Sequence, residues 1–394
     1  CVESRQFPRV RVGESLDWSA PQLFDALGLS RDALIEEQIG TYKREVHGFT
    51  SEGDRLVGGP PGWFRRWPMR FETATIHVDR ERFDEMLFDA ALDAGVEFVW
   101  ERVRTVHMIG DRISDCVTSS GRSFRAGWYV DASGRTRIVG RAARIATQRW
   151  GCERIGLWRY RRSSVTFEGT ALHFDDTAPD LVWAWEIPIG VQRTSVGVVM
   201  PVTDFRDARG EAESLDEVLN RVLVRFPSLD TNGLAGPTRA RTFQPYVSQR
   251  IVGTNWLMVG ESAALVDPLS SSGVSAAIRH GVEAAATIIS VEGSPKSRNR
   301  LLTRYDRRVS DVARLYNEAL QRLLYHPQLR TRLGMRQAAR AYVIVGYLAS
   351  ALYNRIEPAE STARQTTMTL NINFFHLWTR LWTFASLAAK PPHP

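Results

Sequence analysis

The residues with most capacity for chemistry lie in the segment from Gly260 to Val274, which reads GESAALVDPLSSSGV. Asp267 and Pro268 lead into three serines and a glycine, and an apolar run follows. Proline fixes the direction of the chain, and serine often precedes a helix. The first amides of a helix have no intrahelical partner and carry partial positive charge. The segment predicts a helix through Ile289 whose start binds an anion; the alternative is an ordinary serine-capped helix.

A second candidate is Lys43, one of only three lysines among 51 basic residues. An ammonium group can lose its proton and react through nitrogen, whereas a guanidinium stays protonated in proteins. In a chain so rich in arginine, a lysine that is retained is a candidate for chemistry. The alternative is a solvated surface lysine, since Arg44 and Glu45 follow it.

Two tryptophans stand two residues apart in the run from Trp183 to Pro188, which reads WAWEIP. Alternate residues of a strand share one face, so both rings would point to the same side. One interpretation is that Trp183 and Trp185 only fill core volume, as large aromatic side chains often do.

Regular elements must hold these residues in place. The run after Asp79 has Phe83, Leu87 and Ala90 at helical spacing and ends at Gly95, which predicts an amphipathic helix. Residues 96–130 alternate and are broken by Gly-containing turns, which predicts a small antiparallel meander. Its last strand runs into Asp131-Ala132-Ser133-Gly134, small residues that let a ligand approach the main chain at a sheet edge.

Composition excludes several classes of protein. A length of 394 residues, 43% of them hydrophobic and 24% charged, indicates a globular protein of two lobes. The net charge of +7 comes with no nucleic-acid-binding motif, so we expect no nucleic-acid partner. Three cysteines without C-x-x-C spacing and scattered histidines argue against a metal site. Uncharged runs shorter than the roughly 18 residues of a spanning helix favour a cytoplasmic protein without stable membrane insertion.

Three segments lie in this order along the chain: Asp131 to Gly134, Trp183 to Pro188 and Gly260 to Val274. Together they resemble segments of the flavin-dependent halogenases and their relatives among the FAD monooxygenases. The resemblance implies an α/β fold: a Rossmann-like FAD-binding domain interleaved with an antiparallel-sheet substrate domain, followed by a helical C-terminal region. We assign residues 1–40, 79–145 and 251–295 to the FAD-binding domain, 41–78 and 146–250 to the substrate domain, and 296–394 to the helical region.

The chain contains no G-x-G-x-x-G turn. In a dinucleotide fold an acidic residue about 20 residues after that turn binds the ribose hydroxyls. Glu3 resembles this acid, so we expect the first strand, the glycine turn and the first helix of the fold to be missing from the sequence. The alternative is that Glu3 is a surface acid in a disordered terminus.

The resemblance also implies site residues. Lys43 matches the lysine that takes up or hydrogen-bonds hypohalous acid, and Trp183 and Trp185 would wall the passage between flavin and substrate. Glu261 stands where the family usually has the aspartate that holds the ribityl chain, and Ser270 stands where tryptophan halogenases carry glutamate. The catalytic set is completed by Ser271, and the cofactor-binding set is Glu3, Arg9, Gly13, Glu14, Ser15, Val103, Asp131, Ala132, Gly260, Glu261, Asp267, Pro268, Ser272, Gly273 and Val274, with no metal ligand.

The implied function is oxidation of an aromatic ring. Reduced FAD would react with O₂ to a flavin 4a-hydroperoxide, which either hydroxylates an indole, phenol or pyrrole or oxidises chloride or bromide for halogenation. The substrate would be free or bound to a carrier or protein, and a separate flavin reductase would supply electrons. The alternative is an FAD-dependent reductase of the isoprenoid (geranylgeranyl) type.

Overall fold

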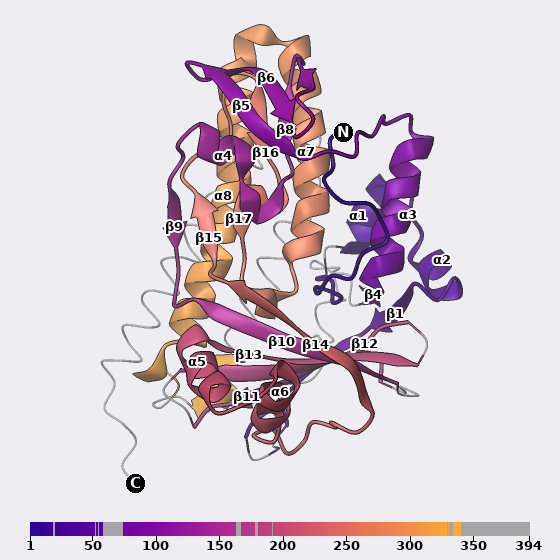
Figure 1. Ribbon diagram of the computed structural model, residues 1–394, viewed down its shortest axis with the longest axis vertical. Coiled ribbons are helices and arrows are strands. Elements are labelled where there is room, and N and C mark those ends of the chain that lie inside the picture. The colour runs from indigo at the N-terminus through magenta and orange to yellow at the C-terminus, as the bar shows by residue number, and fades with distance from the viewer. Residues whose placement is uncertain are drawn as a thin grey trace, which may run out of the picture.

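The computed structural model describes residues 1–18, 20–51, 53, 55–57, 74–162, 167–177, 180–190, 192–328, 330 and 334–339. Figure 1 shows two lobes, one built on a broad sheet and one on two long helices, with the short N-terminal elements beside the long helices. The expected interleaving is visible, because strands of each lobe come from segments far apart in the sequence. None of the described helices is long and apolar enough to cross a membrane.

The broad sheet has seven strands, and all its pairs are antiparallel except β2 with β11. Alternation along the strands gives it two apolar faces. Val182 and Ala184 face α5 and α6, whereas Trp183 and Trp185 face the end of α8. In spatial order the strands are β14 (Leu234–Phe243), β10 (Arg154–Arg162), β13 (Arg193–Pro201), β12 (Val182–Pro188), β11 (Gly169–Asp175), β2 (Glu45–Phe49) and β3 (Arg55–Val57), and the helices are α5 (Val202–Gly210), α6 (Leu215–Leu223) and α8 (Arg298–Leu323).

The other lobe is centred on a parallel pair, β8 (Tyr129–Asp131) and β16 (Trp256–Met258). A further parallel bridge joins Val2 to Val99. One apolar cluster joins the pair to α7 (Gly273–Gly293) and α8 and also to the expected meander. The meander consists of β5 (Val103–Ile109), β6 (Arg112–Thr118) and β7 (Ser123–Phe124).

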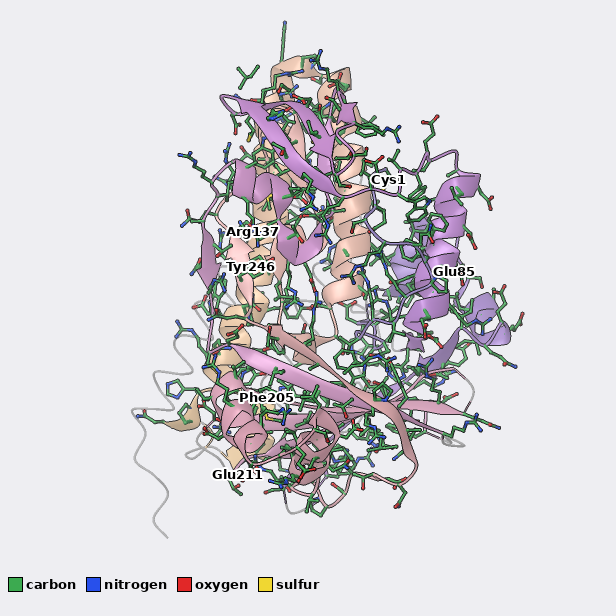
Figure 2. The ribbon with its side chains drawn as sticks, in the orientation of Figure 1. Cys1, Glu85, Arg137, Phe205, Glu211 and Tyr246 are labelled. Atoms are coloured by element: carbon green, nitrogen blue, oxygen red, sulfur yellow. The ribbon has the colours of Figure 1, made fainter. Side chains whose placement is uncertain are left out.

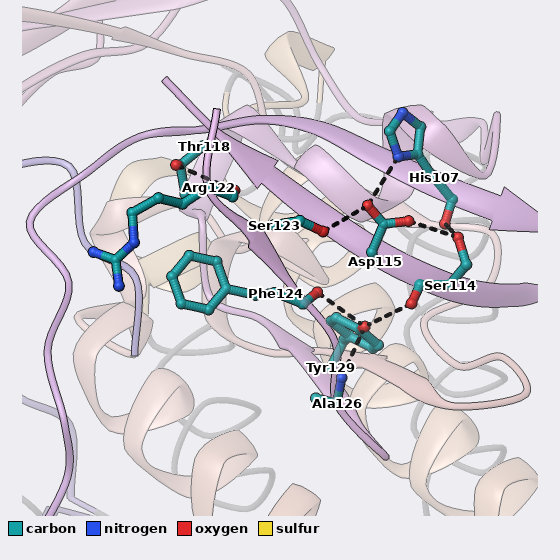
Figure 3. A network of polar contacts seen from close by, with 9 residues as sticks. All are labelled: His107, Ser114, Asp115, Thr118, Arg122, Ser123, Phe124, Ala126 and Tyr129. Atoms are coloured by element: carbon teal, nitrogen blue, oxygen red, sulfur yellow. Dashed lines mark hydrogen bonds and ion pairs between the residues drawn. The ribbon is translucent and has the colours of Figure 1, made fainter. Parts of the chain in front are cut away.

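Polar contacts hold the meander together, as Figure 3 shows. Asp115 accepts a hydrogen bond from Ser123 at 3.1 Å and lies 3.1 Å from Nδ1 of His107. The hydroxyl of Tyr129 donates to the carbonyl of Phe124 and accepts from the amide of Ala126. These contacts fix the start of β8 relative to the meander, and β8 ends at Asp131.

The N-terminal elements form one compact unit around Leu16, Phe24, Ile76 and Phe83, and Val274 of α7 packs against it. The expected amphipathic helix is α3, and Asp79 caps it by accepting from the amide of Glu81. The unit contains α1 (Ala20–Ala26), α2 (Arg31–Glu36), β1 (Gly40–Lys43), β4 (Thr75–Val78) and α3 (Arg80–Asp93), with β1 paired to β4.

A small sheet lies between the two lobes. It consists of β9 (Thr147–Arg149), β15 (Tyr246–Ser248) and β17 (Ala264–Leu265), so β9 and β15 leave the broad sheet although they fall within the expected range 146–250. The remaining short elements are η2 (Gly134–Thr136), α4 (Ile138–Ala142), η3 (Gly260–Ser262), η4 (Pro268–Ser270) and η5 (Pro295–Ser297). The predicted domain boundaries stay a prediction, and the C-terminal helices expected beyond residue 339 lie outside the described residues.

Candidate active site

Lys43 is buried at the end of β1, with a side chain that is only 3% exposed. Its ammonium donates to Oγ of Ser15 at 2.9 Å and to the carbonyl of Leu16 at 2.9 Å. The ring of Trp18 lies 5.3 Å from the nitrogen. Burial lowers the pKa of Lys43 to about 8, and the charge of Asp17 opposes this effect. The alternative of a solvated surface lysine is wrong.

A chain of buried polar groups continues from Lys43. Ser15 Oγ lies 3.3 Å from Oγ1 of Thr170 on β11, which lies 2.9 Å from Nε2 of His77 on β4. Burial and the charge of Lys43 keep the pKa of His77 well below its usual value, so the ring is neutral; the carbonyl of Pro188 acts in the opposite sense. Nδ1 of His77 is buried and has no hydrogen-bond partner in the described part of the chain, so the tautomer of the ring sets the direction of the contact between His77 and Thr170.

Only the first of these contacts has a fixed direction, because the ammonium of Lys43 must donate to the hydroxyl of Ser15. In the contact between Ser15 and Thr170 either hydroxyl can donate. We call these four residues, Lys43, Ser15, Thr170 and His77, the lysine relay. It joins the N-terminal unit to the broad sheet.

The loop before Ser15 lies against the start of α7. Gly13 has φ of +106°, and a side chain there would meet the guanidinium of Arg80 at 3.1 Å and a methyl of Val274 at 3.9 Å. This backbone conformation favours glycine, and a side chain here would also require Arg80 to shift. Glu14 is buried and accepts from the amide of Gly13 and from the hydroxyl of Tyr160. Burial raises the pKa of Glu14.

The start of α7 has the features expected of an anion site. Asp267 accepts from the amide of Leu269, which shapes η4 after Pro268, and Ser271 follows in the left-handed conformation. Ser272 precedes Gly273 without a side-chain cap, so it leaves the first amides of the helix unoccupied by its own hydroxyl. Burial raises the pKa of Asp267. The backbone hydrogen bond from Leu269, the charge of Arg154 and a hydrogen bond with Tyr325 act in the opposite direction.

The predicted cofactor residues of β8 and β16 meet at one edge. Both strands end there because they are parallel, and the amide of Val259 donates to the carbonyl of Asp131 at 3.0 Å. The carboxylate of Asp131 accepts from the amides of Ser133 and Val139, so it organises the loop that contains the exposed Ala132. Gly260 donates to Nδ1 of His280. The exposed Glu261 pairs with Arg135 at 3.7 Å.

Other predicted residues lie further away in the fold. Glu3 and Arg9 form a two-bonded ion pair with each other, at 3.1 and 3.2 Å. Val103 begins β5 and packs against the cluster around β16. The cofactor roles of all three remain predictions.

Both tryptophans of the WAWEIP run are buried on one face of β12, as predicted from strand periodicity. The ring nitrogen of Trp183 donates to the hydroxyl of Tyr325 at 3.0 Å, and that of Trp185 donates to Ser195 at 3.1 Å. Each ring nitrogen therefore has a hydrogen-bond partner in the core. The end of the run reaches the lysine strand, because Thr41 donates to the carbonyl of Pro188 at 2.8 Å.

Sequence reasoning missed His77 and Thr170. A signal was present at His77, which interrupts an otherwise apolar strand, Thr75 to Val78, directly before a helix cap. Nothing in the local sequence of Thr170 marks it, since its partner Ser15 is 155 residues away.

Comparison with known proteins agrees with this fold. The model of the tryptophan halogenase family matches residues 71–332. The chain therefore belongs to the tryptophan halogenase family, and the predicted resemblance and the α/β fold class are confirmed.

Two relatives and one solved structure show what the chain is similar to. A tryptophan 2-halogenase of Chondromyces crocatus is 29% identical over 74% of this chain and 56% of its own length. A 1H-pyrrole-2-carbonyl-[peptidyl-carrier protein] brominase of Pseudoalteromonas luteoviolacea is 25% identical over 73% of this chain and 70% of its own. The structure of the flavin-dependent brominase Bmp2 aligns with a TM-score of 0.73 and 21% identity over 96% of this chain and 92% of that one, which shows a shared fold. The chain spans little more than half of the tryptophan halogenase.

Proposed function

We propose that this protein is an FAD-dependent halogenase that transfers chlorine or bromine to an aromatic ring through Lys43. The observation that carries the proposal is the buried amine of Lys43, held by two neutral oxygen acceptors in a family of halogenases. A lysine that only paired with a surface acid would offer no comparable nucleophile.

The two acceptors orient the amine. Ser15 Oγ and the Leu16 carbonyl each take one N–H of Lys43. When the ammonium loses its third proton, these two bonds persist and the lone pair takes the remaining tetrahedral position. The pKa of about 8 makes an appreciable fraction of the amine neutral near neutral pH.

The described residues fit the flavin in two places. Gly13 leaves open the space beside Arg80 and Val274 that a side chain would fill, and the uncapped start of α7 at Gly273 and Val274 offers amides to a negatively charged ring. Asp267, Pro268 and Ser271 would shape this loop, with Glu261 and Ala132 at the adjacent edge. Reduced FAD with O₂ supplies the oxidising power that converts halide into hypohalous acid.

Lys43 would carry the halogen from hypohalous acid to the substrate. The neutral amine attacks the halogen of hypohalous acid; an N–halogen bond forms, the halogen–oxygen bond breaks, and hydroxide leaves with the amine proton as water. The aromatic carbon then takes the halogen as the nitrogen–halogen bond breaks, and the proton that the ring loses returns to the nitrogen, which restores the free amine. Arginine could not replace Lys43, because a guanidinium does not become neutral near pH 7.

The substrate is an indole, phenol or pyrrole, free or bound to a carrier or protein. Relatives with both kinds of substrate support this range, since one is named for tryptophan and another for a carrier-bound pyrrole. Ser270 in the position of the tryptophan-halogenase glutamate favours a phenol or pyrrole. We further propose that a separate flavin reductase supplies electrons and that the protein is cytoplasmic.

The test is product analysis of Lys43→Ala and Lys43→Arg with reduced FAD, bromide and a panel of aromatic compounds. We expect both variants to lose brominated product while flavin reoxidation continues. Mass spectrometry of the products decides: the native protein should add bromine to the ring. A gain of one oxygen alone, unaffected by bromide and by Lys43→Ala, would establish direct hydroxylation instead.

A further inference from the structure

A cavity of ≈ 270 Å³ opens at the junction of the two lobes, and four arginines line it: Arg135, Arg137, Arg141 and Arg149. They come from η2, the residue after it, α4 and β9, and Tyr246 of β15, the strand partner of Arg149, also lines the cavity. Figure 2 shows Arg137 and Tyr246 close together on the flank of the molecule, and the guanidinium lies 5.6 Å from the ring centre. We call this site the arginine pocket.

The guanidinium groups converge on one space. Burial raises the pKa of the Tyr246 hydroxyl to about 12, assisted by Glu261, while Arg137, Arg135 and Arg149 all act in the opposite direction. Burial lowers the pKa of Arg137, and the charges of Arg141 and Arg149 add to that effect, whereas Tyr246 and Asp131 oppose it. These positive charges therefore repel one another across the pocket.

Few acidic groups offset this charge. Among the described residues, the only ion pair made by the four arginines joins Arg135 to Glu261 at 3.7 Å. Arg149 donates to the side-chain oxygen of Gln244, and Arg137 donates to the carbonyl of Ile145. Nε of Arg137 is buried and has no hydrogen-bond partner in the described part of the chain. The wall contains one acid, Glu153.

The backbone holds this arrangement rigidly. Asp131 accepts a hydrogen bond from the amide of Val139, and Ser133 accepts one from the amide of Ile138. These two hydrogen bonds fix the start of α4. Between these contacts Arg137 adopts the left-handed conformation with φ of +50°, which is uncommon for a residue with a side chain. Such conformations persist only where the surroundings impose them, and they cluster at ligand sites.

We propose that the arginine pocket binds a phosphoryl group, as a phosphate ester or diphosphate. Guanidinium forks match phosphate oxygens with paired hydrogen bonds, and several guanidiniums from different directions suit a tetrahedral anion of more than one charge. A halide has no geometry for such forks to match. The position between two lobes is typical of ligand sites. This inference does not depend on the proposed halogenase activity.

Calorimetric titration of the full chain tests the proposal at constant ionic strength. Inorganic phosphate, ADP and pantetheine 4′-phosphate are the three probes, because free phosphate, a nucleotide and a carrier arm share the chemistry and differ in source. The test variant combines Arg141→Gln with Arg149→Gln, two exposed residues that line the pocket. The control combines Arg104→Gln with Arg112→Gln, exposed residues of the meander that change the net charge equally.

We expect at least one probe to bind the native protein, and the test variant to bind it roughly 10-fold or more weakly for each charged hydrogen bond lost. The control should bind like the native protein, and the tightest probe identifies the source. Equal weakening in the control, or binding no tighter than that of bromide, would overturn the proposal. Displacement of the probe by FAD in direct competition would also overturn it, because the pocket would then belong to the flavin.

Discussion

Burial changes the chemistry open to Lys43, because the charged amine loses its hydration. With a pKa of about 8 the neutral fraction grows as pH rises through that value. We expect the rate of carbamylation of Lys43 by cyanate, a small reagent that attacks neutral amines, to rise with a midpoint near pH 8. Peptide mass spectrometry can follow this rate, since the chain has only three lysines and Lys296 serves as the internal reference. Midpoints that coincide for Lys43 and Lys296 would contradict the prediction.

Ser15 is a positioning residue in the lysine relay. Its hydroxyl stabilises the ammonium by accepting a hydrogen bond, so Ser15→Ala should lower the pKa of Lys43 further and move the carbamylation midpoint below pH 8. Halogenated product should fall as well, since one of the two bonds that orient the lone pair is lost. Ser310→Ala, which alters a buried serine of α8, is the matched control. A lower product yield with an unchanged midpoint would reduce Ser15 to a structural role.

At the scale of elements, the short helix η4 sets the approach to α7. Asp267 caps η4 and is buried, so Asp267→Ala should disturb the loop through Ser271 to Gly273. A charge-assisted hydrogen bond contributes about 1.5–3 kcal/mol, which corresponds to roughly 10- to 150-fold in FAD affinity. Fluorescence titration with FAD should show this loss for Asp267→Ala and little change for Lys43→Ala.

The control for that experiment removes a cap far from the predicted flavin site. Ser214 caps α6 on the other face of the broad sheet by accepting from the amide of Glu217. Ser214→Ala should cost stability without changing FAD affinity. If Asp267→Ala binds FAD as the native protein does, the cofactor domain has been assigned to the wrong residues.

Strand β12 shows how one element can serve two purposes. Its alternation places Trp183 and Trp185 in the core, where each ring nitrogen has a partner. At the end of the strand, the carbonyl of Pro188 accepts a hydrogen bond from Thr41, which stands two residues before Lys43. The core role of the tryptophans is therefore supported, and their role as walls of a flavin–substrate passage stays a prediction.

For the whole molecule, the dependence of turnover on oxygen distinguishes a halogenase from an isoprenoid-type reductase. With reduced FAD supplied, we expect oxygen consumption measured by an electrode to proceed with or without halide, and the product to carry halogen only when bromide or chloride is present. An isoprenoid-type reductase would instead convert its substrate without oxygen. Turnover under anaerobic conditions with reduced FAD would therefore favour the reductase.

The sequence by itself determined the local elements and the family. Phe83, Leu87 and Ala90 predicted α3, the alternation around Trp183 predicted a shared face, and the segment from Pro268 onward predicted the start of α7. These predictions succeeded because periodicity and capping depend on neighbours within a few residues. The amine chemistry of Lys43 also follows from residue type alone.

Only the tertiary structure decided which distant residues meet. His77 and Thr170 are 93 residues apart, and Ser15 and Lys43 are 28 apart, yet they form one buried relay. The arginine pocket likewise combines Arg137 with Tyr246. Periodicity shows that a face is buried but not what covers it, because strand register and packing fix the partner. The pKa of Lys43 changes for the same reason: the fold, not the residue type, removes the water around its charge.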